Sequence, residues 1–393
     1  MIDKNRLLHI GWKLVSYLRK EEWQIEPNGM AKSISLQKSE GWMRPSANVE
    51  SEKGGHFAAF YDPTPFDSIA NPCRAYSLIN SVAFHPHELM FCATFTTAHK
   101  VAIFRIDPAG KIRTVQVLKN PRARLRGPQH AVFSGDGNKI IVSNWNNATL
   151  TIYRRTENGL YSRDPVACID FPEVLAAYKP HGMDMSPSGK FMAIAFGAAA
   201  RQKKGVALFS FNSEETILEH LSLIDEEELP GIPKGITFSP DESCLLVTFS
   251  DVNSIQIYNL DLEMGSIQST PRQIVKGEIT GLFRPEDIKM SREGDFLIVS
   301  NSEADRVTVY PFDKVANRIT QAAPCRILEN PVSHLRFPHG IAVSPDGSIL
   351  AITQFGPLQT TRDEDIVFDI RTPRKQSSIT IYRRERPGSH VNS

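Results

Sequence analysis

Residues 338–353 read Pro-His-Gly-Ile-Ala-Val-Ser-Pro-Asp-Gly-Ser-Ile-Leu-Ala-Ile-Thr, a turn signal between two short apolar runs. In the turn that begins at Ser344, proline presets φ at the second position, the aspartate side chain can cap the turn, and glycine tolerates the positive φ that closes it. The flanking runs, Gly340–Val343 and Ile349–Thr353, have the apolar and β-branched composition of strands. The stretch therefore predicts a β-hairpin.

The same turn recurs along the chain, followed each time by a third strand that ends in an aromatic residue. The copies begin at Ser134, Ser186, Ser239, Ser291 and Ser344, with a degenerate copy at His85, and the aromatic residues are Phe104, Tyr153, Phe209, Tyr258, Tyr310 and Tyr382. In four copies the aromatic residue lies 19 positions after the first residue of the turn, and the two longer copies contain polar insertions at 197–205 and 356–377. This constant register predicts a four-stranded unit repeated six times, which is the pattern of a β-propeller.

We therefore predict an all-β, six-bladed propeller over residues 72–393, with four strands in each blade. The sixth copy ends soon after Tyr382, so its outer strand is expected from the N-terminal side, from Pro72–Leu78, which would close the ring and protect the open edge. Residues 1–71 are expected to form an amphipathic helix at Asp3–Trp23 and an irregular extension, both packed on the propeller. A degenerate seventh blade within residues 26–71 stays open as an alternative.

Charge and composition limit the classes of partner. The chain has 45 Lys and Arg against 44 Asp and Glu, so no global field favours nucleic acid or an anionic membrane. The five cysteines are scattered, unlike a disulfide framework or a metal motif, which favours a reducing compartment. No run approaches the roughly 18 apolar residues of a spanning helix. We expect a soluble, cytoplasmic protein without a nucleic-acid partner, and the sequence leaves its oligomeric state open.

Two repeats resemble a known family. The stretch at 338–353 and the run Gly127-Pro-Gln-His-Ala-Val-Phe-Ser-Gly-Asp-Gly, followed by Val142-Ser-Asn, resemble repeats of the lactonase-like and NHL or SMP-30-like propellers. The resemblance covers about residues 74–384. It implies the propeller architecture, on which such families carry lactone hydrolysis, metal-assisted ester hydrolysis or binding alone. Lactonase-type relatives with this repeat have seven blades, whereas six are counted here.

Polar residues stand where a propeller opens into its central channel. The first strand of each blade lines the channel, and the positions at the start of the six first strands are all polar or charged. They are Asn80, Gln129, His181, Lys234, Glu286 and His339. The loops that follow the second strands begin at the same mouth and add Asn144, Trp145, Asn301 and Gln354. The pattern predicts a ligand-binding mouth, although polar residues there could also serve only to contact water.

A hydrolase could work with this set of residues. His339 or His181 would act as the general base, because the unperturbed pKa of histidine, about 6.5, lies near working pH. Lys234 would steady a developing oxyanion, and Glu286 is the candidate catalytic carboxylate. No cofactor is expected, and the alternative is a hard divalent cation held by the oxygens of Glu286, Asp287, Asn301 and Asn144.

Cations in the neighbouring loops suggest an anionic ligand. Arg124 and Arg126 lie in the linker at 119–127, with further lysines and arginines in the two insertions, although acidic residues of the longer insertion could neutralise them. The apolar run at 366–370 within that insertion suggests a lid over the mouth. The alternative to an enzyme is a non-catalytic scaffold that binds a protein or peptide across this face.

Overall fold

The computed structural model describes residues 61–70, 77–119, 125–197, 202–356 and 377–384, together with the backbone of 24–25, 31–32, 359–360 and 366–367. The chain divides into two units, Met1–Ala59 and Phe60–Ser393. In the first unit, β1 (Gln24–Ile25) pairs with β2 (Ala31–Lys32) in antiparallel fashion. The helix expected at Asp3–Trp23 lies outside the described residues.

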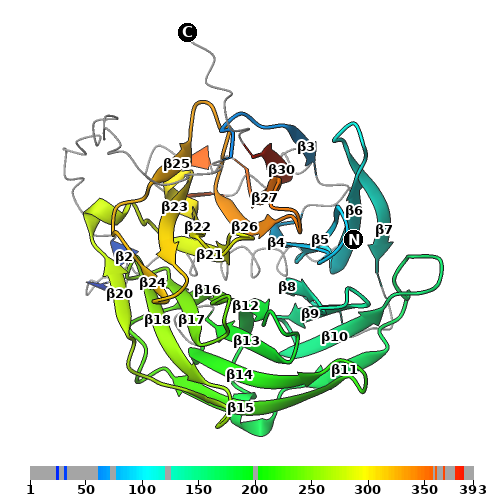
Figure 1. Ribbon diagram of the computed structural model, residues 1–393, viewed down its shortest axis with the longest axis horizontal. Helices are drawn as coiled ribbons and strands as arrows, with labels where there is room; N and C mark the ends of the chain where they lie inside the picture. Colours follow the sequence, from blue (N-terminus) through cyan, green and yellow to red (C-terminus); the bar gives the residue numbers. More distant parts are fainter. Residues whose placement is uncertain are drawn as a thin grey trace. The chain divides into compact units, whose positions relative to one another are not determined.

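The second unit is a ring of six antiparallel sheets, so the predicted all-β propeller is confirmed (Figure 1). Blade 1 contains β4 (Ile79–Phe84), β5 (Met90–Phe95), β6 (Lys100–Ile106) and β7 (Ile112–Leu118). Blade 2 contains β8 (Pro128–Phe133), β9 (Lys139–Asn144), β10 (Thr149–Arg154) and β11 (Ala167–Asp170). Blade 3 contains β12 (Pro180–Met185), β13 (Phe191–Phe196), β14 (Gly205–Asn212) and β15 (Ile217–Asp225).

Blades 4 and 5 each gain an extra strand beside the third one. Blade 4 contains β16 (Pro233–Phe238), β17 (Cys244–Phe249), β18 (Ser254–Asp261) and β19 (Ser266–Ile267), with β20 (Gln273–Lys276) on β18. Blade 5 contains β21 (Pro285–Met290), β22 (Phe296–Asn301), β23 (Arg306–Asp313) and β24 (Arg318–Ile319), with β25 (Arg326–Glu329) on β23. Blade 6 contains β26 (Pro338–Val343), β27 (Ile349–Gln354), β30 (Ser378–Arg383) and β3 (Asp67–Ala70).

The remaining elements are short. Three 3-10 turns occur in the described part, η1 (Glu173–Leu175), η2 (Glu278–Thr280) and η3 (Ser302–Ala304), and that part contains no α-helix. Within the long insertion of blade 6, β28 (Gln359–Thr360) pairs with β29 (Ile366–Val367). The side chains of this insertion lie outside the described residues, so the lid stays a prediction. None of the helical segments among the described residues has the length and apolar character needed to cross a membrane.

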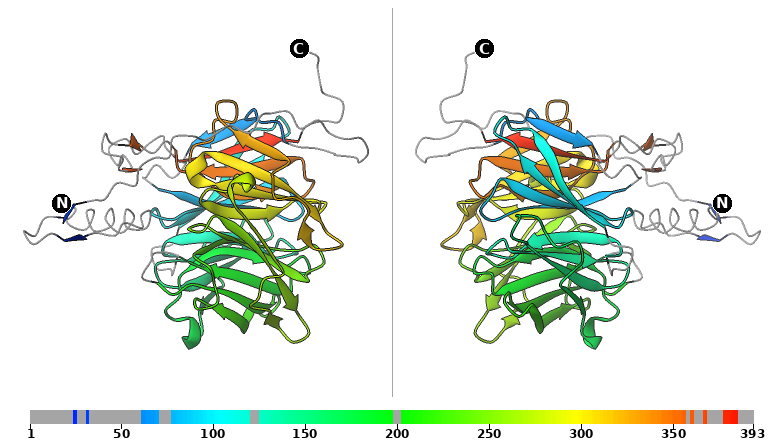
Figure 2. Two further views of the ribbon diagram at one scale, coloured as in Figure 1. Left: turned by 90° about the vertical axis from the view of Figure 1, so that its left-hand side faces the viewer. Right: turned by 90° about the vertical axis from the view of Figure 1, so that its right-hand side faces the viewer.

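The ring is closed by a strand from the N-terminal side. β3 pairs with β30, and in the side views the blue and red segments lie next to each other (Figure 2). The closing strand is therefore Asp67–Ala70, a few residues before the stretch Pro72–Leu78 expected from the sequence. A bridge between Tyr61 and Arg384 extends the pairing. Closure leaves blade 6 with a complete set of four strands, as the edge argument requires.

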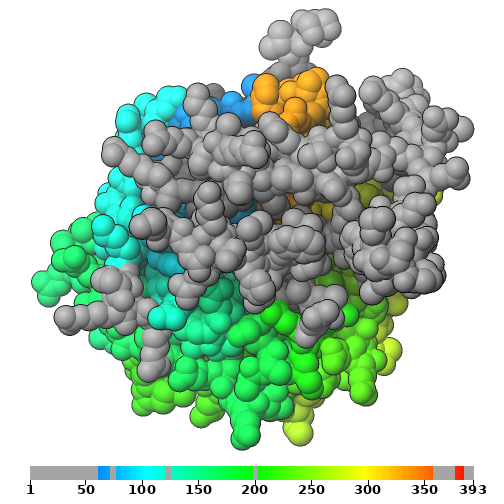
Figure 3. Space-filling view, turned by 180° about the vertical axis from the view of Figure 1, so that it is seen from behind, coloured from blue at the N-terminus to red at the C-terminus, as the bar shows by residue number. Residues whose placement is uncertain are grey.

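The core lies between the blades. Six clusters of buried apolar residues each join two consecutive blades, including one between blades 6 and 1 that contains Ile79, Phe104 and Ile381. The six aromatic residues of the third strands are all fully buried, and each strand continues for one to three residues beyond its aromatic residue. Seen from behind, the green residues of blades 2 to 4 form the lower part of the surface (Figure 3).

The turn chemistry is also as predicted. In the copy at Ser344, the serine hydroxyl donates to Asp346 Oδ1 at 2.5 Å and accepts from the backbone N–H of Ile349 at 2.9 Å. Gly347 has φ +69°, in the left-handed region that glycine adopts without a steric cost. These turns hold the first and second strands of the blades in register.

Candidate functional site

Each first strand contains a β-bulge near its start, at the mouth of the channel. In blade 3, Pro180 pairs with Phe196 but the next regular pair is Met183 with Ile194, so one extra residue is accommodated on β12. The same irregularity occurs in the other five blades. A bulge re-aims side chains away from the ladder. It frees the second residue of each first strand to face the channel axis.

Hydroxyl groups of the second strands hold these bulges in place. In five blades the backbone N–H of the third residue of the first strand donates to a serine or threonine directly across the sheet. The pairs are Ser81 with Thr94, His130 with Ser143, Gly235 with Thr248, Asp287 with Ser300, and Gly340 with Thr353, at 2.7–3.0 Å. The bulged N–H groups, which the ladder does not satisfy, are thereby hydrogen-bonded.

Glycine at the third position allows the first strands to approach closely. A Cβ atom on Gly182 would lie 2.0 Å from the carbonyl oxygen of Lys234, and one on Gly340 would lie 2.7 Å from that of Asn80. Any other residue would push neighbouring strands apart. The side chains that precede these glycines are His181 and His339, whose ring centroids lie 5.7 Å apart.

The six residues predicted at the channel mouth all occupy the second position of a first strand, and all are buried. A small cavity lies among them and is lined by Asn80, Gln129, His130, His181, Gly182, Glu286, Asp287 and His339. The volume open to the centres of water molecules is about 10 Å³, which is room for about one water. Near this cavity an ion pair between Lys289 Nζ and Asp184 Oδ1, at 3.1 Å, links the first strands of blades 5 and 3.

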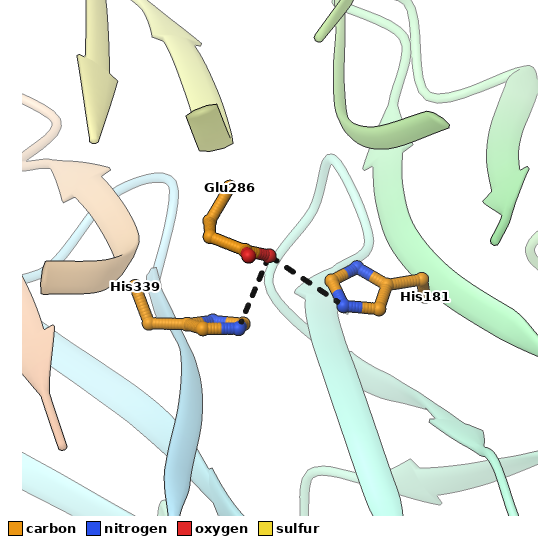
Figure 4. Close-up of side chains that lie close together, drawn as sticks. All are labelled: His181, Glu286 and His339. Atoms are coloured by element: carbon orange, nitrogen blue, oxygen red, sulfur yellow. Dashed lines mark ion pairs between the residues drawn. The ribbon is translucent and has the colours of Figure 1, made fainter. Parts of the chain in front are cut away.

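The four predicted catalytic side chains form one cluster, in which His181, Glu286 and His339 line the cavity and Lys234 lies beside them. Glu286 Oε2 lies 3.4 Å from His339 Nε2, 3.9 Å from His181 Nε2 and 3.5 Å from Lys234 Nζ. Lys234 Nζ in turn lies 3.1 Å from His181 Nε2. In Figure 4 the imidazoles of His339 and His181 lie on different sides of the Glu286 carboxylate, and dashed lines mark the two ion pairs. Four consecutive blades, 3 to 6, thus each contribute one side chain to the cluster.

The electrostatics of the cluster keep both histidines neutral. Burial lowers the pKa of His181 to about 4 in spite of the nearby Glu286 carboxylate. Burial also lowers the pKa of His339. Burial lowers the pKa of Lys234 to about 8, with Glu286 opposing the shift. Burial raises the pKa of Glu286, but Lys234 and the two histidines outweigh that effect, so its net pKa is lowered and the carboxylate stays ionised.

Sequence reasoning missed His130 as a lining residue and considered Asp287 only as a cation ligand. Both stand at the third position of a first strand, where the bulge allows two consecutive side chains to face the channel region. His130 Nε2 lies 3.9 Å from Asp287 Oδ2, and neither ring nitrogen of His130 has a hydrogen-bond partner among the described residues. Asp287 Oδ2 accepts the backbone N–H of Ile341 at 2.9 Å, which ties blade 5 to blade 6.

Three residues predicted to bind ligand are instead used inside their own blades. Asn144, Asn301 and Gln354 end second strands, and each amide oxygen accepts a backbone N–H from the loop before the first strand, that of Arg126, Phe283 or Arg336. Their amide nitrogens donate within the same blades. The Asn144 and Asn301 oxygens of the hard-cation alternative are thus already hydrogen-bonded to backbone N–H groups. Trp145, next to Asn144 in the chain, is half-buried, and its backbone N–H donates to the carbonyl oxygen of Gly127.

Cations precede the first strands in four blades. Arg126, Lys179, Arg284 and Arg336 lie one or two residues before the prolines that begin those strands. Arg284 pairs with Glu303 at 3.3 Å, and Arg336 pairs with Asp305 at 3.7 Å. Arg126 is exposed, and Arg124 lies outside the described residues. Loops at the channel mouth therefore contain positive charge that is only partly compensated among the described side chains.

Comparison with known proteins places these observations in context. A family model described as "Lactonase, 7-bladed beta-propeller" matches residues 81–283. A protein from Lactobacillus plantarum of known structure is 14% identical, with a TM-score of 0.53 over 78% of this chain and 88% of that one. A luciferin-regenerating enzyme is 13% identical, with a TM-score of 0.54 over 80% and 94%.

A periplasmic gluconolactonase from Pseudomonas aeruginosa is 16% identical, with a TM-score of 0.48 over 66% of this chain and 71% of that one. At these identities the solved structures show similarity of fold alone. No curated protein sequence matches the chain.

Proposed function

We propose, from the premise that the chain belongs to the lactonase 7-bladed β-propeller family, that its channel-mouth pocket hydrolyses a lactone that bears an anionic group. The family description specifies seven blades, whereas the described residues form six. The proposal is carried by one observation: Glu286 Oε2 lies within 4 Å of three nitrogen atoms, those of His339, His181 and Lys234, at a cavity of the size of a water molecule.

The tautomer of His339 suits it to the role of general base. Its Nδ1 lies 2.8 Å from the carbonyl oxygen of Asn80, which can only accept, so Nδ1 carries the hydrogen and Nε2 has the lone pair. Because burial lowers the pKa of His339, this nitrogen is unprotonated near neutral pH and can take a proton from water. The ionised Glu286 would stabilise the imidazolium that forms.

Hydrolysis would then proceed in two steps. A water in the cavity attacks the lactone carbonyl carbon while His339 Nε2 takes its proton, and the carbonyl oxygen becomes an oxyanion facing the Lys234 ammonium. The intermediate collapses, the ring C–O bond breaks, and the imidazolium returns the proton to the leaving ring oxygen. The product is an open-chain hydroxy acid. Its carboxyl group, which keeps the second hydrogen of the attacking water, ionises in neutral solution, so each turnover releases one proton.

The size of the cavity determines where the substrate lies. With room for about one water, the pocket cannot enclose a sugar ring, so only the carbonyl group would enter and the remaining atoms would lie at the mouth. There the loop cations Arg126 and Lys179 could attract a carboxylate or phosphate of the substrate. This favours sugar-acid lactones with a charged substituent over neutral ones.

The test is proton release by the full chain against a panel of neutral and anionic lactones, followed in weakly buffered solution. We expect hydrolysis of anionic members above the spontaneous rate, and a fall in kcat/KM of at least about 100-fold in His339→Gln, the lower range for loss of a general base. His220→Gln is the matched control, because His220 lies on the outer strand β15. Equal rates in His339→Gln and His220→Gln would refute the assignment.

The small cavity also favours a second candidate, a non-catalytic propeller that binds a protein or peptide across its mouth. Such a partner would contact the loops without entering the channel. Charge reversal at Arg126 and Arg336 would then abolish partner capture while His339→Gln leaves it intact. If the protein is a hydrolase, lactone hydrolysis should instead fall most in His339→Gln and less after charge reversal at Arg126 and Arg336.

A further inference from the structure

Two acceptor atoms face each other in the pocket with no hydrogen between them. Since His339 Nδ1 donates to the carbonyl of Asn80, the lone pair of Nε2 points toward Glu286 Oε2 at 3.4 Å. A neutral imidazole nitrogen and an ionised carboxylate oxygen repel each other at this distance unless a cation lies between them. Glu286 Oε2 is buried and has no hydrogen-bond partner among the described residues. The Lys234 ammonium, 3.5 Å away, balances part of its charge, and a cation between Oε2 and His339 Nε2 would satisfy both acceptors.

A third acceptor lies close by. His181 Nε2 lies 3.1 Å from Lys234 Nζ, and an ammonium group only donates, so this nitrogen also has a lone pair, which accepts from Lys234 when no ion is bound. It lies 3.9 Å from Glu286 Oε2. Two imidazole nitrogens and one carboxylate oxygen therefore converge from blades 3, 5 and 6, with all three atoms within 4.8 Å of one another.

We propose that His181 Nε2, His339 Nε2 and Glu286 Oε2 bind a divalent transition-metal ion of the zinc type. Two histidines and a glutamate are a ligand set that zinc takes in catalytic sites, where a water completes the tetrahedron. With bonds of about 2.0–2.1 Å, tetrahedral ligand atoms lie about 3.3 Å apart. The distance between His339 Nε2 and Glu286 Oε2, 3.4 Å, already fits, whereas His181 Nε2, which lies 3.9 Å from Glu286 Oε2 and within 4.8 Å of His339 Nε2, has to move closer to both.

The surroundings of His339 fit a metal ligand as well. Histidines that bind metal usually donate their other ring N–H to a carbonyl or carboxylate, which fixes the tautomer and the ring orientation. The bond from His339 Nδ1 to Asn80 has this form, and the Phe355 ring stacks on the imidazole with a centroid distance of 4.6 Å. The ring is thus oriented before any ion arrives.

Lys234 competes with the ion. Its Nζ atom lies 3.1 Å from one proposed ligand and 3.5 Å from another, so an ammonium group at this place repels a divalent cation strongly. Binding requires that Lys234 swing away or release its proton to solvent. Replacement of Lys234 by methionine, which keeps the length of the side chain and removes the charge, is therefore expected to tighten binding at least 10-fold, or by about 1.4 kcal/mol.

The metal site concerns the same pocket but does not rest on the proposed lactone hydrolysis, since the ligand set stands on geometry alone. A bound ion would supply a polarised water, and His339 would then hold the ion instead of accepting the proton. The experiment below separates metal binding from hydrolysis.

The experiment is calorimetric titration of the chelator-treated full chain with Zn²⁺, with Co²⁺ absorption as a second readout of tetrahedral nitrogen and oxygen ligands. We expect one ion per chain, binding weakened at least about 100-fold in His339→Gln and in Glu286→Gln, and tighter binding in Lys234→Met. His220→Gln is expected to bind as the wild type does. Circular dichroism of each variant verifies folding, and Lys234→Met supplies a gain of affinity that misfolding cannot mimic.

Two results would overturn the metal site: no binding by either the wild type or Lys234→Met, or undiminished affinity in a folded His339→Gln. Lactone hydrolysis is measured on the same samples with and without Zn²⁺. Hydrolysis by a chain that binds no zinc would refute the metal site and leave the hydrolase standing. Zinc binding at this site without hydrolysis of any lactone would refute the hydrolase and leave the metal site standing.

Discussion

Lys234 offers a sharp test of the charge arrangement in the pocket. The side chain is 1% exposed, and its ammonium group lies 3.5 Å from the Glu286 carboxylate. At an effective dielectric constant of about 20, that distance corresponds to an attraction of about 5 kcal/mol, part of which offsets the cost of burying both charges. Removal of one partner of a buried ion pair typically costs about 3–5 kcal/mol, because the other charge is left uncompensated. We therefore expect Lys234→Met to lower the free energy of unfolding by about 3 kcal/mol or more.

Urea unfolding of chelator-treated protein, followed by circular dichroism at neutral pH, measures this loss. The double variant Lys234→Met/Glu286→Gln removes both charges and should be more stable than the two single losses predict, by at least about 2 kcal/mol. The control is Lys190→Met, at an exposed lysine, which should change stability by less than about 0.5 kcal/mol. The reasoning is refuted if Lys234→Met is no less stable than Lys190→Met, or if the double variant shows simple additivity.

Three further predictions concern the scaffold. The Arg383 guanidinium carbon lies 3.3 Å from the centroid of the Phe66 ring, which also packs against Gly110 of blade 1, so Phe66→Ala should lower the free energy of unfolding in urea by about 2 kcal/mol. An unchanged midpoint would show that this contact does not stabilise the closure of the ring. Burial raises the pKa of Asp346, but hydrogen bonds from Ser344 and Ser348 lower it by more, so its pKa is lower in the folded state than in the unfolded state. The ionised carboxylate therefore stabilises the fold above about pH 4, and the difference in free energy of unfolding between wild type and Asp346→Asn should narrow as the pH falls below about 4. Burial raises the pKa of Cys92 to about 12, so alkylation at about pH 8 followed by peptide mass spectrometry should leave it unmodified in the native state, and rapid labelling would contradict its burial.

The repeat could be predicted because it depends on local chemistry. Each Ser-Pro-Asp-Gly type turn fixes its own hairpin, and the aromatic residue of the third strand fills the space between neighbouring blades, so the spacing survives in the sequence. The closing strand was misplaced by a few residues because Asp67–Ala70 has no turn or aromatic residue of its own, and only pairing with β30 identifies it.

The channel-mouth residues could be placed for the same reason, since each immediately precedes the apolar part of a first strand. His130 could not, because a strand without a bulge would turn it away from its neighbour Gln129, and the bulge is a property of the packed ring. For Asn144, Asn301 and Gln354 the sequence could not show what the amide groups contact, because position at the mouth does not determine direction. Their amide oxygens accept backbone N–H groups of the loops that precede the first strands, and their role in ligand binding stays a prediction.

The central claim is that the Glu286 cluster is a hydrolytic centre, and the most direct measurement is kcat/KM for an anionic lactone in Glu286→Gln. The matched control is Glu157→Gln, at an exposed glutamate of blade 2, and both variants are assayed where unfolding curves show them to be fully folded. A fall of at least about 100-fold in Glu286→Gln alone would support the claim. Equal kcat/KM in the two variants would contradict it.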